Sequence, residues 1–359
     1  MLTLPLLALL SVPPFAQPAA AAALPPAHAI AALPAPIAHV AQERAWEAAL
    51  GTLRNTRLTA ARVADDHLIV QDADGGLTAL DPATGVTRWF VRLPGPLDRW
   101  PAGGGGTLVL VAGGEVLVVD AASGRRLARL TSPDVPAGSP VSDGRLLFTP
   151  ALVGHRLVAT ELERGQRLWE FRFGTPLDGP ALLVGERAGR TVIVATDDGV
   201  LHGIPAQAEP PRTERWIART GRLAGPAVSD GQRVFVATED REVLALDAGT
   251  GDTLWRHLPG QSLTGGVVLS GDLVVVGTAD RVIALEAATG AERWKRKQPD
   301  RPLAASGGVI QVAREGEVAL LDAADGHDLV TGLPKATVLA DGVVVERLPE
   351  SLVATRLSR

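Results

Sequence analysis

Residues 246–255 read LDAGTGDTLW, and the same pattern returns as LDPATGVTRW at residues 80–89 and as LEAATGAERW at residues 285–294. Each copy joins an acidic residue to Thr-Gly and then to Trp at a fixed spacing. Weaker copies keep the spacing but lose the Trp or the Thr-Gly, so the Trp position falls at residues 46, 89, 128, 169, 216, 255, 294 and 330. Successive positions are 36–47 residues apart. A repeat of about 40 residues with strand-like patterning is typical of β-propeller blades.

The copy that ends at residue 257 shows how one repeat unit should fold. Its short runs of apolar and β-branched residues span residues 226–229, 233–238, 242–247 and 252–257. Turn-forming residues such as Asp230-Gly231 separate these runs. Asp247 can accept hydrogen bonds from the amides of the following turn, and Gly251 suits the positive φ that such a turn requires. The pattern therefore predicts blades of four antiparallel strands.

The two ends of the repeat region complement each other. Residues 44–50 carry an outer strand with Trp46 but no strands before it, whereas residues 337–346 and 351–356 supply inner strands without an outer one. Joining them in one shared blade removes two exposed sheet edges. We therefore predict an all-β, eight-bladed propeller closed by an N-terminal outer strand. A seven-bladed ring, or a helix at residues 42–50, is the alternative.

The Trp residues of the outer strands are predicted to be structural. Because Trp buries a large apolar ring, each one is expected to pack between its own blade and the next. This docking set consists of Trp46, Trp89, Trp169, Trp216, Trp255 and Trp294.

The first 41 residues differ from the repeat region. An apolar run at residues 2–12 is followed by an alanine-rich stretch, which is typical of a signal peptide, although no Lys or Arg precedes the run. We predict a signal peptide at residues 1–23, an Ala/Pro-rich linker at residues 24–41 and a single propeller domain at residues 42–359. The chain would then be exported to the periplasm or another extracytoplasmic compartment.

Composition argues against several kinds of function. The chain has no cysteine, so disulfides, thiolate catalysis, cysteine-based zinc sites and a lipid anchor on cysteine are not expected. The formal net charge of −5 gives no basic surface for nucleic acid. No transmembrane span is expected, and the seven histidines are scattered without metal-ligand spacing. We predict no catalytic residue, no metal, no cofactor and a monomeric chain.

Five residues are the candidate partner-binding positions. A Pro-rich break in the repeat contains Arg99 and Trp100, and an exposed aromatic side chain there would resemble an interface anchor. Lys295, Arg296 and Lys297 form the densest basic run and could meet an acidic partner. The structural alternatives are burial of Trp100 against its own blade and a solvated loop for the basic run.

Other motifs are better explained by turns and loops. Residues 103–106 are four glycines, but they lack the Lys and the helix that a phosphate-binding loop needs. Asp72 and Asp74 resemble the start of a calcium loop without its downstream Glu, so a hairpin turn is favoured and calcium binding is the weaker hypothesis. The longest insertion, at residues 205–215, is a further candidate for binding because function in repeat folds resides in loops.

The pattern at residues 79–89 and 245–255 resembles the repeat of pyrroloquinoline-quinone-type propellers. Strong and partial copies together cover residues 44–359. One branch of this family contains the quinoprotein alcohol and glucose dehydrogenases. The alcohol dehydrogenases of this branch hold their cofactor with a vicinal disulfide and a calcium ion. The other branch is non-catalytic and includes the periplasmic outer-membrane assembly factor BamB, which is anchored by an acylated cysteine. In length and in its N-terminal Trp strand the chain resembles the second branch, but its lack of cysteine departs from both.

These observations support one leading function and two alternatives. The leading hypothesis is a non-catalytic exported propeller that acts as a protein-binding or assembly scaffold. The resemblance implies that this scaffold takes part in assembly of the cell envelope or of outer-membrane proteins. The alternatives are a glycan- or ligand-binding sensor module and, less favoured, a quinone-dependent oxidoreductase. A repeat fold does not by itself fix the function.

Overall fold

The computed structural model describes residues 41–50, 57–64, 66–104, 106–131, 136–186, 189–333, 337–340 and 343–358. The predicted signal peptide and all but the last residue of the predicted linker lie outside this part of the chain. The described residues belong to one compact unit. No helix in the described part is both long enough and apolar enough to cross a bilayer.

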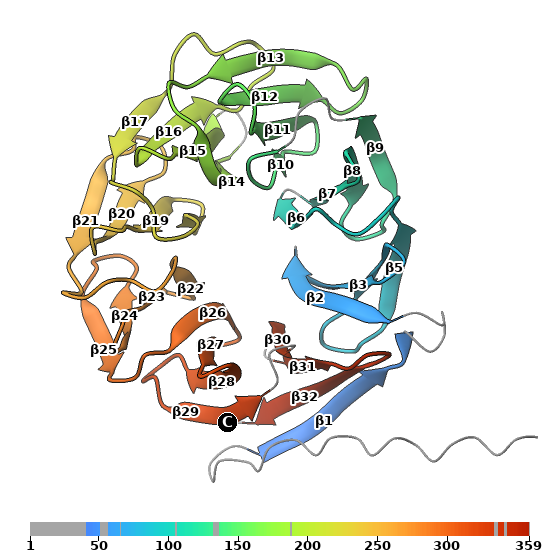
Figure 1. Cartoon of the computed structure of the whole chain (residues 1–359), viewed down its shortest axis with the longest axis vertical. Coiled ribbons are helices and arrows are strands. Elements are labelled where there is room, and N and C mark those ends of the chain that lie inside the picture. The colour runs from blue at the N-terminus through green and yellow to red at the C-terminus, as the bar shows by residue number, and fades with distance from the viewer. Residues whose placement is uncertain are drawn as a thin grey trace, which may run out of the picture. The chain divides into compact units, whose positions relative to one another are not determined.

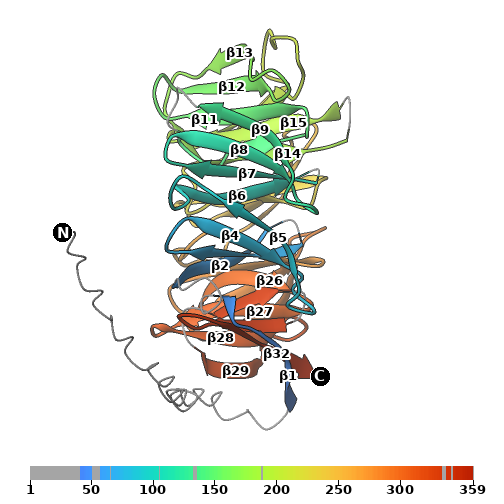
Figure 2. The same cartoon turned by 90° about the vertical axis from the view of Figure 1, so that its right-hand side faces the viewer.

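Within the described residues, the strands form eight sheets of four strands each. Figure 1 shows these sheets arranged as blades around a ring, and Figure 2 shows the same ring from its side. In seven blades the strands are consecutive, and each strand pairs antiparallel with the next one. The predicted eight-bladed, all-β propeller is confirmed.

The first four blades occupy the first half of the ring. Blade 1 consists of β2 (Leu58–Ala64), β3 (His67–Asp72), β4 (Gly76–Leu80) and β5 (Thr87–Arg92). Blade 2 consists of β6 (Arg99–Gly104), β7 (Thr107–Ala112), β8 (Glu115–Asp120) and β9 (Arg126–Thr131). Blade 3 consists of β10 (Val141–Ser142), β11 (Leu146–Ala151), β12 (Arg156–Glu161) and β13 (Arg167–Arg172). Blade 4 consists of β14 (Leu177–Val184), β15 (Thr191–Thr196), β16 (Val200–Pro205) and β17 (Trp216–Arg219).

The remaining blades complete the circle. Blade 5 consists of β18 (Val228–Ser229), β19 (Arg233–Ala237), β20 (Val243–Asp247) and β21 (Thr253–His257). Blade 6 consists of β22 (Val268–Ser270), β23 (Leu273–Gly277), β24 (Val282–Glu286) and β25 (Glu292–Arg296). Blade 7 consists of β26 (Arg301–Ser306), β27 (Val309–Arg314), β28 (Glu317–Asp322) and β29 (Asp328–Leu333). Blade 8 consists of β30 (Thr337–Ala340), β31 (Val343–Arg347), β32 (Leu352–Ser358) and β1 (Ala41–Ala48).

Blade 8 is built from both ends of the described chain. Its outer strand, β1, pairs antiparallel with β32, and Trp46 lies opposite Ala354. Figure 1 shows the blue β1 beside the red β32. The predicted closure by an N-terminal strand is therefore confirmed, and β1 excludes the alternative of a helix at residues 42–50.

The middle strands explain why the sequence contains short, continuously apolar runs. In β19, Val234 and Val236 pack in the core shared with blade 4. Phe235 and Ala237, which alternate with them, pack in the core shared with blade 6. Because successive side chains of a strand point to opposite faces, a blade covered on both sides requires apolar residues at every position.

Each outer-strand Trp locks its blade to the next one. Trp216 of blade 4 donates a hydrogen bond from Nε1 to the carbonyl oxygen of Ala248 in blade 5, at 3.2 Å. Gly251, in the same turn as Ala248, has φ of 75° and lies against the ring, so an added Cβ would come within 2.6 Å of Trp216. The same Nε1 bond to the following blade is made by Trp46, Trp89, Trp169, Trp255 and Trp294. For Trp46, Trp216 and Trp255, the Trp ring and the Thr-Gly turn of the next blade are thus two halves of one inter-blade contact.

Two junctions lack the Trp and are filled differently. Between blades 2 and 3, Ala128 occupies the Trp position, and Leu162 packs against it in the same core. Leu162 stands where the other turns carry a smaller residue such as Ala248. Between blades 7 and 8, Val330 occupies the Trp position and packs against Val344 of β31.

The junction between blades 7 and 8 also buries a carboxyl group. Glu346 lies two residues after Val344 on β31, so both side chains point to the same face of the strand. Glu346 is 8% exposed, and its Oε1 has no hydrogen-bond partner among the described residues. Burial raises the pKa of Glu346 above its ordinary value of 4.5. The charged form therefore destabilises the folded state.

We expect Glu346→Gln to stabilise the protein at neutral and alkaline pH. A raised folded-state pKa means that stability is highest below the ordinary pKa and is lost as the pH rises through the raised one. An unsatisfied buried polar group costs about 1–3 kcal/mol, and the neutral amide removes the charged part of that cost. Thermal unfolding of both proteins across pH 4–9 measures the difference. A variant whose advantage grows toward acid pH would contradict the assignment.

Candidate functional site

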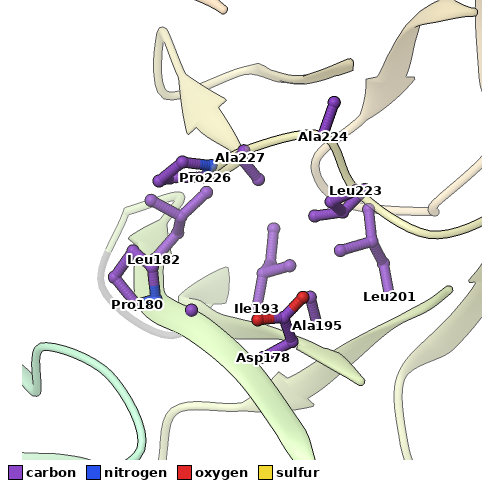
Figure 3. Close-up of a pocket in the computed structure, with 12 residues that line it drawn as sticks. Asp178, Pro180, Leu182, Ile193, Ala195, Leu201, Leu223, Ala224, Pro226 and Ala227 are labelled. Carbon is purple, nitrogen blue, oxygen red and sulfur yellow. The ribbon is translucent and has the colours of Figure 1, made fainter. Parts of the chain in front are cut away.

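A cavity lies between the inner parts of blades 4 and 5. Its volume is about 290 Å³. One wall comes from β14, β15 and β16 of blade 4, and the other comes from the segment that leads into β18 of blade 5. Figure 3 shows Leu182, Ile193, Leu201 and Leu223 arranged around it.

A bulge in β14 shapes this cavity. The pairing of β14 with β15 shifts between Asp178 and Leu182, and Gly179 within the bulge has φ of 82°. Gly138 of the preceding blade approaches the bulge so closely that a Cβ there would lie 1.8 Å from the carbonyl oxygen of Gly179. A bulge redirects the side chains beside it. Here the exposed Asp178 carries the cavity's one charged group, and Figure 3 shows its carboxylate beside Ala195.

The chemistry of the cavity suits an apolar group with a hydrogen-bond donor or a positive charge beside it. Its other side chains are apolar, and the surrounding backbone contains Gly179, Pro180, Gly225 and Pro226. Pyrroloquinoline quinone carries several carboxylates, and the only charge that lines this cavity is the negative Asp178. The residues of this cavity therefore do not fit the quinone cofactor.

The Asp72 turn accounts for the calcium-like motif. Asp72 Oδ1 accepts hydrogen bonds from the amides of Asp74 and Gly76, at 2.9 and 2.7 Å, as expected of a side chain that stabilises a turn. Within the described residues, no group of three or more His, Cys, Asp or Glu side chains could hold a metal ion.

The predicted basic run does not form one continuous basic surface. Arg296 donates hydrogen bonds to both carboxylate oxygens of Asp328 in blade 7, each at 2.7 Å. Lys295 pairs with Glu292 at 2.9 Å on the surface. Lys297 is exposed and makes no ion pair with the described part of the chain. Arg296 is therefore a structural link between blades 6 and 7.

Arg314 extends this link into a buried network. Its guanidinium donates hydrogen bonds to Asp300 at 2.9 and 2.7 Å and to Asp328 at 2.8 Å. Asp300 is fully buried. Burial opposes ionisation of Asp328, but the hydrogen bonds from Arg296 and Arg314 hold the pKa of Asp328 below its ordinary value. The network fixes the outer strand of blade 6 against blade 7.

The two remaining candidate binding regions are the segment with Arg99 and Trp100 and the insertion at residues 205–215. Arg99 and Trp100 lie in β6, the inner strand of blade 2, and their side chains fall outside what the structure describes. The insertion at residues 205–215 supplies the carbonyl of Gln207, which accepts the Trp169 hydrogen bond at 2.9 Å. At least this part of the insertion serves the scaffold.

The cavity residues were missed at the level of sequence. Asp178, Leu182 and Leu223 match no catalytic or binding motif. The sequence feature that could have indicated the cavity was the Gly179-Pro180 pair inside a strand, because Pro and Gly inside strand patterns often mark a bulge.

The architecture first defines the class of protein. Blades whose outer-strand Trp packs on the next blade, at three junctions on an acidic, Thr-Gly turn, are those of a pyrroloquinoline-quinone-type repeat propeller. The family model described as outer membrane protein assembly factor BamB matches residues 37–171, 112–207, 203–262 and 239–339. The chain belongs to this family.

Curated relatives include both branches of the repeat. BamB of Xanthomonas campestris is 36% identical over 108 residues, which are 25% of this chain and 26% of that protein. BamB of Bordetella pertussis is 33% identical over 153 residues, which are 42% of this chain and 36% of that protein. A quinohemoprotein alcohol dehydrogenase of Pseudomonas putida is 36% identical over 92 residues, which are 22% of this chain and 13% of that protein. The chain thus spans about a quarter to a third of the length of the BamB relatives named here.

Solved structures show the same fold at low sequence identity. BamB of Moraxella catarrhalis superposes with a TM-score of 0.61 at 16% identity, over 88% of this chain and 100% of that one. The computationally designed protein Ika8 gives a TM-score of 0.61 at 16% identity, over 84% of this chain and 96% of that one. The propeller scaffold is therefore shared by natural and designed chains.

Proposed function

We propose that this chain is an exported, non-catalytic propeller that holds protein partners during outer-membrane protein assembly. The observation that carries the proposal is the BamB family match, which extends over most of the propeller. The inter-blade Trp contacts support a rigid platform, because each blade is fixed to its neighbour by a buried ring and a hydrogen bond. The apolar cavity with its single carboxylate supports a docking role better than a quinone site.

A chromosomal deletion tests the assembly role. We expect the outer membrane of the deletion strain to contain less folded β-barrel protein, because a scaffold of the assembly machinery would be absent. The measurement is the heat-dependent gel shift of barrel proteins in purified outer membranes. Re-expression of the full chain should restore the folded band, and cell fractionation should find the chain outside the cytoplasm. Unchanged barrel levels in the deletion strain would contradict the proposal.

The purified chain tests the absence of catalysis. It is mixed with pyrroloquinoline quinone and calcium and then passed through a gel-filtration column. We expect no quinone absorbance to co-elute with the protein, and we expect the chain to elute as a monomer. Co-elution of the quinone together with alcohol oxidation would establish the oxidoreductase alternative.

A further inference from the structure

A second hollow lies on the outer side of the ring, between blades 1 and 2. Its volume is about 710 Å³. Blade 1 contributes residues of β5 and the turn after it, and blade 2 contributes residues of β7, β8 and β9. We call this hollow the perimeter groove. Its apolar wall includes Val91 and Leu93 on one side and Leu110 and Leu117 on the other.

The apolar wall is incompletely covered by the protein itself. Leu117, three residues before the acidic residue of its turn, is only half-buried. Leu244, at the equivalent position of blade 5, is 2% exposed. Phe90, at the edge of the groove, is 40% exposed. The same repeat position is therefore buried at the junction of blades 4 and 5 but partly exposed at the junction of blades 1 and 2.

Four arginines and one glutamate supply the charged lining of the groove. Arg129 is already paired with Glu115, at 3.0 and 2.7 Å. Arg92 and Arg126 are exposed and form no ion pair with the described part of the chain. Arg125 also lines the groove. This local positive charge contrasts with the net charge of −5 of the whole chain.

β5, which forms one side of the groove, is an edge strand. It pairs with β4 on one side and is the last strand of its sheet. An extended peptide could therefore add to the outer edge of this sheet beside exposed apolar side chains.

We propose that the perimeter groove binds an extended segment of a partner protein in which acidic and apolar residues alternate. Its apolar side chains would cover Val91 and Leu117, and its carboxylates would pair with Arg92 and Arg126. The inference deepens the proposed function, because it names the surface and the chemistry of the partner that the scaffold holds.

Fluorescence anisotropy with synthetic peptides tests the groove directly. The probe is a fluorescein-labelled peptide of alternating Glu and Leu, used at nanomolar concentration with the full chain. A Lys/Leu peptide and a Glu/Ser peptide separate the charged from the apolar contribution. We expect binding only of the Glu/Leu peptide, weakened about tenfold in Arg92→Glu/Arg126→Glu and weakened by added salt.

Arg219→Glu is the matched control. Arg219 follows Trp216 by three residues, as Arg92 follows Trp89, and it is exposed on the outer strand of blade 4. This variant should bind the Glu/Leu peptide like the natural chain, and circular dichroism should show that all variants fold. The inference is overturned if the Glu/Leu peptide does not bind, if the Lys/Leu peptide binds equally well, or if reversal at Arg92 and Arg126 has no effect. The deletion strain tests the scaffold role separately, so the two ideas can fail independently.

Discussion

Replacement of Trp255 by Ala is expected to lower the free energy of unfolding by about 3–5 kcal/mol. The ring is 9% exposed, packs near Phe235 with ring centroids 6.0 Å apart, and donates its Nε1 hydrogen to Ala287 of blade 6 at 3.0 Å. The substitution removes the ring from the core, leaves a cavity and leaves the Ala287 carbonyl without this donor. Urea unfolding followed by far-ultraviolet circular dichroism measures the loss without depending on Trp fluorescence.

Leu254→Ala provides the control for this experiment. Leu254 precedes Trp255 on the same strand, but its side chain points outward and is 49% exposed. Exposed substitutions usually change stability by less than about 0.5 kcal/mol. An effect of Trp255→Ala as small as that of Leu254→Ala would show that the inter-blade ring does not stabilise the propeller.

Replacement of Asp300 by Ala should have an effect of similar size, about 3 kcal/mol or more. The carboxylate is fully buried and receives two hydrogen bonds from Arg314. Its removal leaves a largely buried guanidinium whose remaining hydrogen-bond partner, among the described residues, is Asp328. Removal of one member of a buried pair is strongly destabilising because the remaining charge loses its compensation. Urea unfolding again gives the free energy.

The exposed pair of Asp272 and Arg293 supplies a control for charge removal. These groups lie 3.3 Å apart, and their side chains are 74% and 52% exposed. Such surface pairs contribute about 0–1 kcal/mol, so Asp272→Ala should be nearly neutral. Equal effects of Asp300→Ala and Asp272→Ala would mean that the buried network does not hold blades 6 and 7 together.

The propeller ring could be predicted from the sequence because the residues that indicate it lie close together within each repeat. The turn that begins at Asp247 and the Trp at residue 255 lie within one repeat, and their recurrence gives both the number of blades and the closing strand. The two residues that form each contact between blades lie about one repeat apart in the sequence. Their pairing could therefore not be predicted from the repeat pattern. Nothing near Arg296 in the chain indicates that Asp328 is its partner.

The cavity between blades 4 and 5 could not be predicted, because it depends on a bulge and on contacts between blades that the pattern of a single strand does not show. Asp178 reaches the cavity because β14 bulges at Gly179, and the bulge fits against Gly138 of the preceding blade. The perimeter groove likewise depends on how completely Leu117 is covered by a neighbouring blade. Periodicity identifies which residues face a neighbour, but it does not measure how well the two faces fill the space between them.

The pairing of β1 with β32 has a consequence for the order of events during biosynthesis. The strand around Trp46 is made early, yet the strand that it pairs with is made only at the end of the described chain. Contacts so distant in sequence form slowly, and unpaired strands are prone to aggregate while they wait. A nascent chain interrupted before Leu352 would leave β1 without its partner strand, and the Trp46 ring would lack part of the core that covers it. Closure of blade 8 therefore waits for β32, the strand that is made last in the described part of the chain.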